Sequence, residues 1–267
     1  MKNICVVTGG GSGMGLATAK VLGRDNYVII AGRTLKKLEN ALAELTAEGI
    51  EAEAFACDVS NSSSVNSLVA RAISIGRIST VIHAAGMSPQ MGDAKTIMQV
   101  NAIGTINIHE SFYKVMDEGS CIIDISSMSG HMVPWLILPK NKFKYSRVNK
   151  DLFFKMMIGR VNLFPQKIRS SIAYIISKNF VIWYAKTDAV KFGNRGIRVL
   201  SVSPGFFETP MGELEKKRTD AYIKNSAIKR MGRVEEIANL ISFCVSDKAS
   251  YLTGTDILCD GGCIAAR

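Results

Sequence analysis

The chain has 267 residues, of which 47% are apolar and 21% charged, and these proportions are typical of one large globular domain. Its net charge of +10 lies mostly in residues 131–171, where nine basic residues and one acidic residue give +8. Because the rest of the chain is almost neutral, the composition argues against a general nucleic-acid-binding surface. The longest apolar run, near residues 132–138, is too short to span a bilayer.

The N-terminal sequence and the cysteines indicate the cellular compartment in which the protein lies. The sequence MKNICVVTGG leads directly into a strand pattern, so we expect no signal peptide. The six cysteines form no CxxC pair and have no zinc-ligand spacing. We therefore predict a cytoplasmic protein with reduced cysteines and without a metal site.

Apolar runs alternate with segments of helical periodicity along the chain. The predicted strands cover residues 4–9, 27–33, 51–58, 79–86, 120–127, 197–205 and 256–262. The predicted helices cover residues 13–23, 34–49, 61–74, 95–116, 172–190 and 233–246. Strands that are nearly continuous in apolar residues, each followed by a helix, indicate a parallel sheet covered on both faces. The prediction is a single α/β domain over residues 1–267, a doubly wound Rossmann-type fold with a parallel seven-stranded sheet.

The sequence VTGGGSGMG, residues 7–15, lies at the first strand-to-helix turn. A dinucleotide pyrophosphate binds at such a turn, because backbone N–H groups and the helix N-terminus face it. Gly9, Gly13 and Gly15 permit the tight turn and the close packing that a side chain would prevent. A structural turn is the alternative, but the position after a strand and before a helix favours nucleotide binding.

The spacing TGxxxGxG is typical of the short-chain dehydrogenase/reductase family, which the chain resembles along almost its whole length. Residues 57–59, CDV, resemble the adenine-contacting Asp-Val of that family, and residues 83–86, HAAG, resemble its Asn-Asn-Ala-Gly. His83 replaces the first of those asparagines, and we interpret it as a packed histidine rather than a catalytic one. The resemblance implies a cofactor site formed by Thr8, Gly9, Gly11, Ser12, Gly13, Met14, Gly15, Arg33, Asp58, Val59, Ala84, Ala85, Gly86, Tyr174, Lys178, Pro204, Gly205, Phe207 and Thr209.

Arg33 bears on which nicotinamide cofactor is used. In NAD-binding proteins an acidic residue after the second strand binds the ribose 2′-hydroxyl and would repel a 2′-phosphate. Here that position holds Arg33, whose planar guanidinium suits a phosphate, and Lys36 and Lys37 follow it. Ser12 replaces a basic residue that many NADP-binding members carry, which weakens the argument. We expect NADP(H) to be favoured over NAD(H).

Tyr174 and Lys178, four residues apart in YIISK, lie on one face of a predicted helix. A free tyrosine has a pKa near ~10, and a nearby ammonium lowers it by favouring the phenolate. Tyr174 could then act as the general acid–base toward a carbonyl or alcohol oxygen. No other tyrosine of the chain has a lysine four residues later.

The family resemblance completes the catalytic set. It implies that Ser127 polarises the substrate oxygen, that Lys178 also binds the nicotinamide ribose, and that Asn101 holds a water in a proton relay. Ser126 is the less favoured serine of the pair. The sequence SPGFFETPM resembles the Pro-Gly-x-x-x-Thr of the family, which implies that Phe207 and Thr209 hold the carboxamide.

Residues 131–171 separate Ser127 from Tyr174 and form an insertion, because these two residues lie much closer together in most of the family. A subgroup resembling bacterial 3α-hydroxysteroid dehydrogenase/carbonyl reductases carries a helical insertion at this place. Leu152, Phe153 and Met156 recur at helical spacing, so the insertion is either a packed appendage with a solvated basic face or a substrate lid. Its cations could favour an anionic substrate; a nucleic-acid or membrane role is disfavoured.

These observations predict an NADP(H)-dependent short-chain oxidoreductase that interconverts a ketone and a secondary alcohol, with a hydroxysteroid or another bulky carbonyl compound as candidate substrate. A 3-oxoacyl-thioester reductase would share every catalytic motif. A catalytically silent nucleotide-sensing or interaction protein is the alternative of another class. In the family the long helices flanking the fifth strand commonly pack against a second subunit, and the insertion could obstruct that face. We therefore expect a homo-oligomer, with a dimer favoured over a tetramer.

Overall fold

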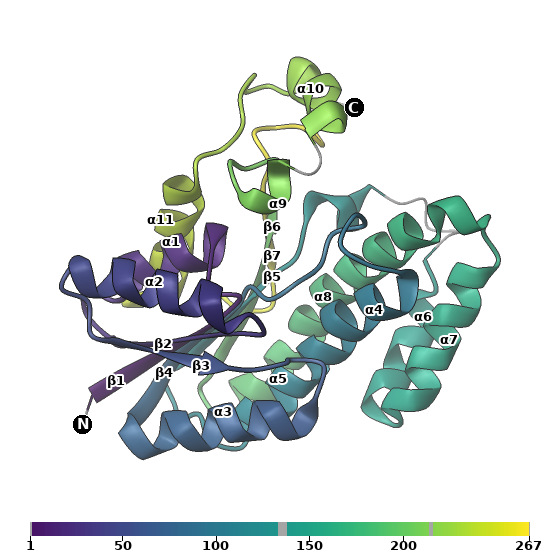
Figure 1. The fold of residues 1–267 in the computed structure, drawn as a ribbon. Coiled ribbons are helices and arrows are strands. Elements are labelled where there is room, and N and C mark those ends of the chain that lie inside the picture. The colour runs from purple at the N-terminus through teal and green to yellow at the C-terminus, as the bar shows by residue number, and fades with distance from the viewer. Residues whose placement is uncertain (1, 133–137, 214–215, 267) are drawn as a thin grey trace.

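The structure is a computed structural model that describes residues 2–132, 138–213 and 216–266. Its centre is a parallel sheet of seven strands in the order β3-β2-β1-β4-β5-β6-β7 (Figure 1). The strands are β1 (Lys2–Thr8), β2 (Tyr27–Gly32), β3 (Ala52–Ala56), β4 (Gly76–His83), β5 (Cys121–Ile125), β6 (Arg198–Pro204) and β7 (Asp256–Cys259). The predicted Rossmann-type fold is confirmed.

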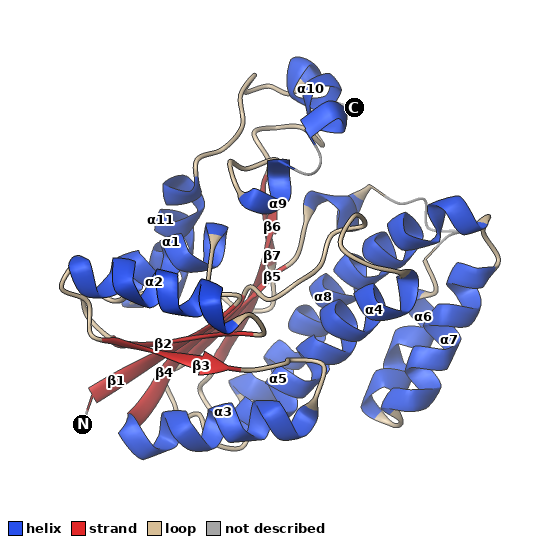
Figure 2. Cartoon of the chain, in the orientation of Figure 1, coloured by secondary structure: helices blue, strands red, loops and turns tan. Residues whose placement is uncertain are grey.

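Helices cover both faces of the sheet (Figure 2). The helices between β1 and β4 are α1 (Gly13–Leu22), α2 (Leu35–Ala47) and α3 (Ser62–Ile75). The chain continues with α4 (Ala94–Met98), the π-helical turn η1 (Gln99–Ile103), α5 (Gly104–Tyr113), the 3₁₀ turn η2 (Met128–His131), α8 (Arg169–Gly193), α9 (Pro210–Glu213), α10 (Lys216–Asn225), α11 (Val234–Val245) and the 3₁₀ turn η5 (Asp247–Ala249). One core lies between the sheet and α1, α2 and α11, and the other between the sheet and α3, α5 and α8.

The central strands are buried on both faces because β-branched and other apolar side chains point alternately into the two cores. In β1, Ile4 and Val6 belong to one core while Cys5 and Val7 belong to the other. The direction of winding reverses between β1 and β4, and ligands of such sheets bind beyond the carboxyl ends of the strands at this reversal. The fold therefore places the glycine-rich turn after β1 at the expected binding edge.

Two helices differ from the sequence prediction. The helix expected over residues 95–116 is interrupted by the π-helical turn η1, which contains Asn101. There the Asn101 side chain binds the backbone of Met87, and a π-helical turn of this kind commonly marks a functional position. The helix that carries Tyr174 begins at Arg169, so Tyr174 lies inside α8 rather than at its start.

The insertion is helical and lies against the outer side of α8 and α4 (Figure 1). It forms α6 (Lys140–Phe143), the 3₁₀ turn η3 (Lys144–Arg147), α7 (Lys150–Asn162) and the 3₁₀ turn η4 (Gln166–Ile168). Phe143 and Phe153 are fully buried and contact Phe180 of α8, with ring centroids 5.2 and 4.6 Å away. The apolar side of the insertion thus extends the core around α8.

All six cysteines are free thiols, and five of them are buried. Burial raises the pKa of Cys5 and of Cys121 to about 12, so both remain protonated. Within the described ranges, none of the helices has the length and apolar character that crossing a membrane would require.

Candidate active site

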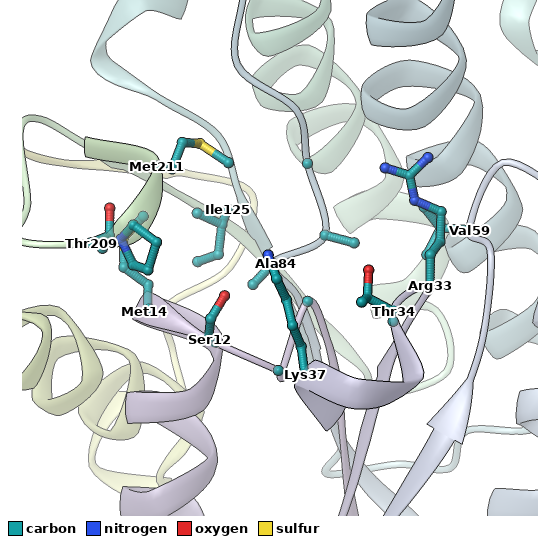
Figure 3. Close-up of a pocket in the computed structure, with 18 of the residues that line it drawn as sticks. Ser12, Met14, Arg33, Thr34, Lys37, Val59, Ala84, Ile125, Thr209 and Met211 are labelled. Atoms are coloured by element: carbon teal, nitrogen blue, oxygen red, sulfur yellow. The ribbon is translucent and has the colours of Figure 1, made fainter. Parts of the chain in front are cut away.

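The glycine-rich turn forms one wall of a cavity of about 210 Å³ at the carboxyl edge of the sheet (Figure 3). Gly9 has a φ of +70°, and a Cβ added to it would lie 2.7 Å from the backbone of Ala84. A Cβ on Gly15 would lie 2.4 Å from the carbonyl oxygen of Gly9. Only glycine fits at these two positions, so the backbone can approach a ligand and the N-terminus of α1 faces the cavity.

Most of the predicted cofactor residues line this cavity. Those that do so are Gly9, Gly11, Ser12, Gly13, Met14, Gly15, Arg33, Val59, Ala84, Ala85, Gly86 and Thr209. Thr8 lies behind the wall, where its hydroxyl accepts a hydrogen bond from the Ala85 N–H at 3.3 Å. Asp58 is not a lining residue, and its carboxylate accepts hydrogen bonds from the backbone N–H and the hydroxyl of Ser60. The adenine contact of Asp58 stays a prediction.

Two basic residues line the cavity. Figure 3 shows Arg33 and Thr34 on the side away from Thr209 and Met211, whereas the Lys37 side chain extends toward Ala84. None of the described residues that line the cavity is acidic. The sequence prediction rested on Arg33, with Lys36 and Lys37 following it. In the structure Lys37 lines the cavity as well, whereas Lys36 faces Glu39 on the exposed side of α2. Arg33 and Lys37 are thus the basic residues among the described residues that line the cavity.

A second cavity, of about 100 Å³, adjoins the first and holds the predicted catalytic residues Ser127, Tyr174 and Lys178. Six residues line both cavities, so the two are continuous: Met14, Ala84, Gly86, Ile125, Thr209 and Met211. Pro204, Gly205 and Phe207, predicted as cofactor residues, also line the second cavity.

The two serines after β5 are held differently. The hydroxyl of Ser126 donates a hydrogen bond of 2.8 Å to the backbone carbonyl of Lys178. The hydroxyl oxygen of Ser127 accepts one of 3.2 Å from the Ser129 N–H, which leaves the hydroxyl proton of Ser127 available to an acceptor in the cavity. This geometry is consistent with the prediction that Ser127 is the serine that polarises the substrate.

Lys178 lies one turn after Tyr174 on α8, and its Nζ is 5.9 Å from the centre of the Tyr174 ring. The ammonium donates a hydrogen bond of 2.9 Å to the carbonyl oxygen of Ile125. Burial lowers the pKa of Lys178 to about 8, and the charge of Asp124 opposes this effect. The lysine is therefore close to losing its proton in the neutral to weakly alkaline range.

Asn101 lies behind Gly86 rather than on the wall of either cavity. Its amide oxygen accepts a hydrogen bond from the Met87 N–H at 2.8 Å, and its amide nitrogen donates to the Met87 carbonyl and to the Ser177 hydroxyl. A Cβ on Gly86 would lie 3.3 Å from Nζ of Lys178 and 3.4 Å from Oδ1 of Asn101. Asn101 thus braces the loop beside Lys178, and its part in a proton relay stays a prediction.

The described part of the insertion lines neither cavity. Several of its cations bind other residues: Lys150 donates to Glu110 and Asn107, and Arg169 donates to backbone carbonyls of residues 162 and 164. Residues 133–137, which connect η2 to α6, lie outside the described residues. The role of the insertion as a substrate lid stays a prediction.

Sequence reasoning missed a group of buried charges behind Lys178. Asp124 of β5 is fully buried and contacts His109 of α5, which in turn contacts Asp188 of α8. A carboxylate inside the apolar strand CIIDI was the available signal, because a buried acid needs a partner. The partners lie 15 and 79 residues from His109 in the sequence, so their spacing gave no indication of a cluster.

Comparisons with known proteins agree with this arrangement. Residues 3–137 match the family model described as short chain dehydrogenase, and residues 164–263 match the model described as enoyl-(acyl carrier protein) reductase. The chain belongs to the short-chain dehydrogenase/reductase family. It is an oxidoreductase of the class that acts on CH–OH and carbonyl groups with a nicotinamide cofactor.

Individual relatives cover almost the whole chain. The short-chain dehydrogenase/reductase bsc3 of Alternaria brassicicola is 27% identical over 271 residues, covering 99% of this chain and 97% of its own. The 3-oxoacyl-(acyl-carrier-protein) reductase FabG of Thermotoga maritima is 28% identical over 274 residues, covering 98% and 97%. A solved short-chain dehydrogenase/reductase from Mycobacterium ulcerans has a TM-score of 0.80 at 25% identity, covering 99% and 90%. A Burkholderia cenocepacia short chain dehydrogenase, solved with NADP, has a TM-score of 0.78 at 24% identity, covering 98% of each chain.

Proposed function

We propose that this chain is an NADP(H)-dependent reductase that interconverts a ketone and a secondary alcohol, with Tyr174 as the acid–base. The observation that carries the proposal is the continuity of the two cavities. The cavity lined by Ser127, Tyr174 and Lys178 adjoins the cavity lined by the glycine-rich turn. A bound nicotinamide would supply or accept the hydride. The residues of the chain then have to orient the substrate oxygen and move one proton.

Each residue has a role that follows from its position. The Ser127 hydroxyl donates a hydrogen bond to the carbonyl oxygen, which increases the positive character of the carbonyl carbon. The Tyr174 hydroxyl transfers its proton to that oxygen as the alcohol forms. The ammonium of Lys178, one helical turn away, stabilises the phenolate that remains. In the direction of oxidation the same groups act in reverse.

The preference for NADP(H) rests on Arg33 and Lys37. Both line the cavity, with Arg33 on the side away from Thr209, and none of the described lining residues is an acid that would repel a 2′-phosphate (Figure 3). The Burkholderia cenocepacia structure was solved with NADP, and the actinorhodin polyketide ketoreductase, with a TM-score of 0.79 at 21% identity, was solved with NADPH. Ser12, which carries no charge, is the feature that runs against this preference.

The substrate side of the second cavity is apolar. Met87, Met128, Phe206 and Met211 line it, and Lys178 is its only charged lining residue among those described. Methionine side chains adapt to irregular ligands, which suits a bulky neutral ketone such as a steroid. The cations of the insertion lie elsewhere, so they do not support an anionic substrate. We propose a cytoplasmic location on the basis of the six free thiols.

One experiment tests the mechanism. A panel of ketones, hydroxysteroids and 3-oxoacyl thioesters is assayed with NADPH and NADH separately, using the natural chain, Tyr174→Phe and the control Tyr145→Phe, which changes a tyrosine of the insertion. We expect Tyr174→Phe to lower kcat by about 10²–10⁴-fold and Tyr145→Phe to leave it unchanged. Undiminished turnover by Tyr174→Phe would defeat the proposal.

The same panel distinguishes the alternatives. The similarity to FabG favours a 3-oxoacyl-thioester reductase as second candidate, and turnover of thioesters without turnover of steroids would select it. Binding of NADPH without turnover of any compound would favour a nucleotide-sensing protein.

A further inference from the structure

A line of buried charges runs behind the catalytic cavity, from the insertion to β5. Nε2 of His109 lies 2.8 Å from Oδ2 of Asp124, and Nδ1 lies 2.8 Å from Oδ2 of Asp188. Arg147 of η3 donates to the other oxygen of Asp188 and, at 2.7 Å, to the hydroxyl of Thr187. His109, Asp124 and Asp188 are each at most 1% exposed. The arrangement therefore joins a cation of the insertion to a carboxylate of the central sheet.

The geometry favours His109 as an imidazolium. Each of its ring nitrogens faces a carboxylate oxygen, and an imidazolium donates a hydrogen bond from both nitrogens. Burial alone would lower the pKa of His109, but the two carboxylates raise it to about 9. The rings of Tyr184 and Phe192 pack edge-on against the imidazole, with centroids 5.1 and 5.5 Å away. The histidine is thus charged and enclosed.

The far end of the line reaches Lys178. Asp124 directly precedes Ile125, whose carbonyl oxygen accepts the hydrogen bond of the Lys178 ammonium. Oδ2 of Asp124 is bound to His109, whereas Oδ1 has no hydrogen-bond partner among the described residues. Asp124 is the group whose charge counteracts the effect of burial on Lys178. The neighbouring carboxylate therefore favours the ammonium form of this buried lysine and limits the fall of its pKa.

Besides Lys178 and His109, the charge of Asp124 acts on Tyr184, Cys121 and His83, its partner across β4 and β5. Burial raises the pKa of Tyr184 and of Cys121, so both stay uncharged. His83 is bound to the Thr8 hydroxyl at 2.9 Å, and burial lowers its pKa to about 4, so it is neutral near pH 7. Lys178 and His109 are therefore the two cations that act on the Asp124 carboxylate.

We propose that Asp124 is a positioning residue for Lys178, and that His109, Asp188 and Arg147 fix its carboxylate from the side of the insertion. The proposal deepens the function proposed above and rests on Lys178 being the lysine that acts with Tyr174. Arg147 of the insertion is the end of this line that lies farthest from Lys178, because it reaches His109 through Asp188.

The matched variants Asp124→Asn and Asp188→Asn test the proposal. Each removes one carboxylate charge from His109, but only Asp124 neighbours Lys178. In Asp124→Asn we expect the alkaline limb of kcat/KM for ketone reduction with NADPH to move to lower pH by about one unit or more, because the buried ammonium loses its opposite charge. In Asp188→Asn we expect the limb to stay in place. An unmoved limb in Asp124→Asn, or equal shifts in both variants, would overturn the proposal.

Two nuclear magnetic resonance measurements do not depend on turnover, so they separate this proposal from the proposed function. With ¹⁵N-labelled lysine, Nζ of Lys178 should titrate at lower pH in Asp124→Asn than in the natural chain and in Asp188→Asn; an unchanged titration contradicts the proposal. If Asp124→Asn does not fold, the natural chain with ¹³C-labelled histidine still decides. His109 should keep its imidazolium signal from about pH 6 to 8, and titration near the ordinary ~6.5 would contradict the proposal.

Discussion

His83 and His109 are both buried, yet their surroundings act on them in opposite ways. His83 has the Thr8 hydroxyl as its partner, so burial dominates and lowers its pKa to about 4. His109 has a carboxylate at each nitrogen, and these raise its pKa to about 9 in spite of burial. The same side chain is therefore neutral at one position and charged at the other.

This contrast predicts opposite dependences of stability on pH. A raised pKa contributes stability that is complete below the unfolded value of 6.5 and lost as the pH rises towards about 9. The free energy of unfolding of the natural chain relative to His109→Gln should accordingly decrease over that range. Relative to His83→Gln it should increase from about pH 4 to 6.5, because there the unfolded chain binds the extra proton. Urea unfolding at several pH values measures both, and parallel trends would show the assignment to be wrong.

The two basic residues that line the cofactor cavity lead to a second prediction at this scale. Arg33→Ala and Lys37→Ala should each raise the KM for NADPH by about 10-fold while changing the KM for NADH little, because each removes one cation from the place of the 2′-phosphate. Lys36→Ala is the control, since Lys36 faces Glu39 instead. Equal effects on both cofactors would place the phosphate elsewhere.

Residues whose partners lie a few positions away in the sequence could be predicted, whereas residues whose partners are distant in the sequence could not. Tyr174 and Lys178 are four residues apart on one helix, and the glycines of the first turn lie within residues 9–15; both sets line the cavities, while their catalytic and cofactor-binding roles stay predictions. The contact of His109 with Asp188 joins two helices 79 residues apart, and no local pattern encodes it. Which of Lys36 and Lys37 lines the cavity could be told only from the structure, because it depends on where each side chain lies.

At the scale of elements, the insertion is a part of the core rather than a loose attachment. Phe153 of α7 is fully buried between Phe143 and Phe180, whereas Leu152, the preceding residue, is 39% exposed. The sequence indicated that this segment is helical and amphipathic. It could not indicate which surface receives the apolar face, because the body and the pocket are both apolar.

Truncation of Phe153 should therefore destabilise the protein. We expect Phe153→Ala to lower the free energy of unfolding by about 3–5 kcal/mol through the cavity that it leaves. Leu152→Ala, the matched change on the exposed side of the same helix, should cost much less, about 0.5 kcal/mol. Urea unfolding followed by tryptophan fluorescence compares them, and similar losses would mean that α7 is not packed as described.

At the scale of the whole molecule, the doubly wound parallel sheet was predictable because most strands are nearly continuous in apolar residues and helical segments connect them. The assembly follows from which surfaces remain. The insertion covers part of α8 and α4, while Phe243, Tyr251 and Leu258, around α11 and β7, are exposed. A contiguous apolar patch formed by such side chains would mark a contact between subunits.

We propose a dimer formed through α11 and β7. Light scattering should give the mass of two chains, and the double change Phe243→Asp with Tyr251→Asp should give that of one, because charges would then be buried in the contact. Val190→Asp, an exposed position on α8, serves as the control and should keep the dimer. A compact tetramer would contradict the proposal.

The position of the insertion in the chain bears on how the protein is made. During synthesis α7 leaves the ribosome before α8, the helix whose aromatic side it covers. Phe153 is therefore already present when Phe180 emerges, and the two helices can pair through neighbouring segments before β6 and β7 exist. We expect α8, the helix that carries Tyr174, to form early in folding. The residues that precede it would then cover its aromatic side and keep that side from contact with other nascent chains.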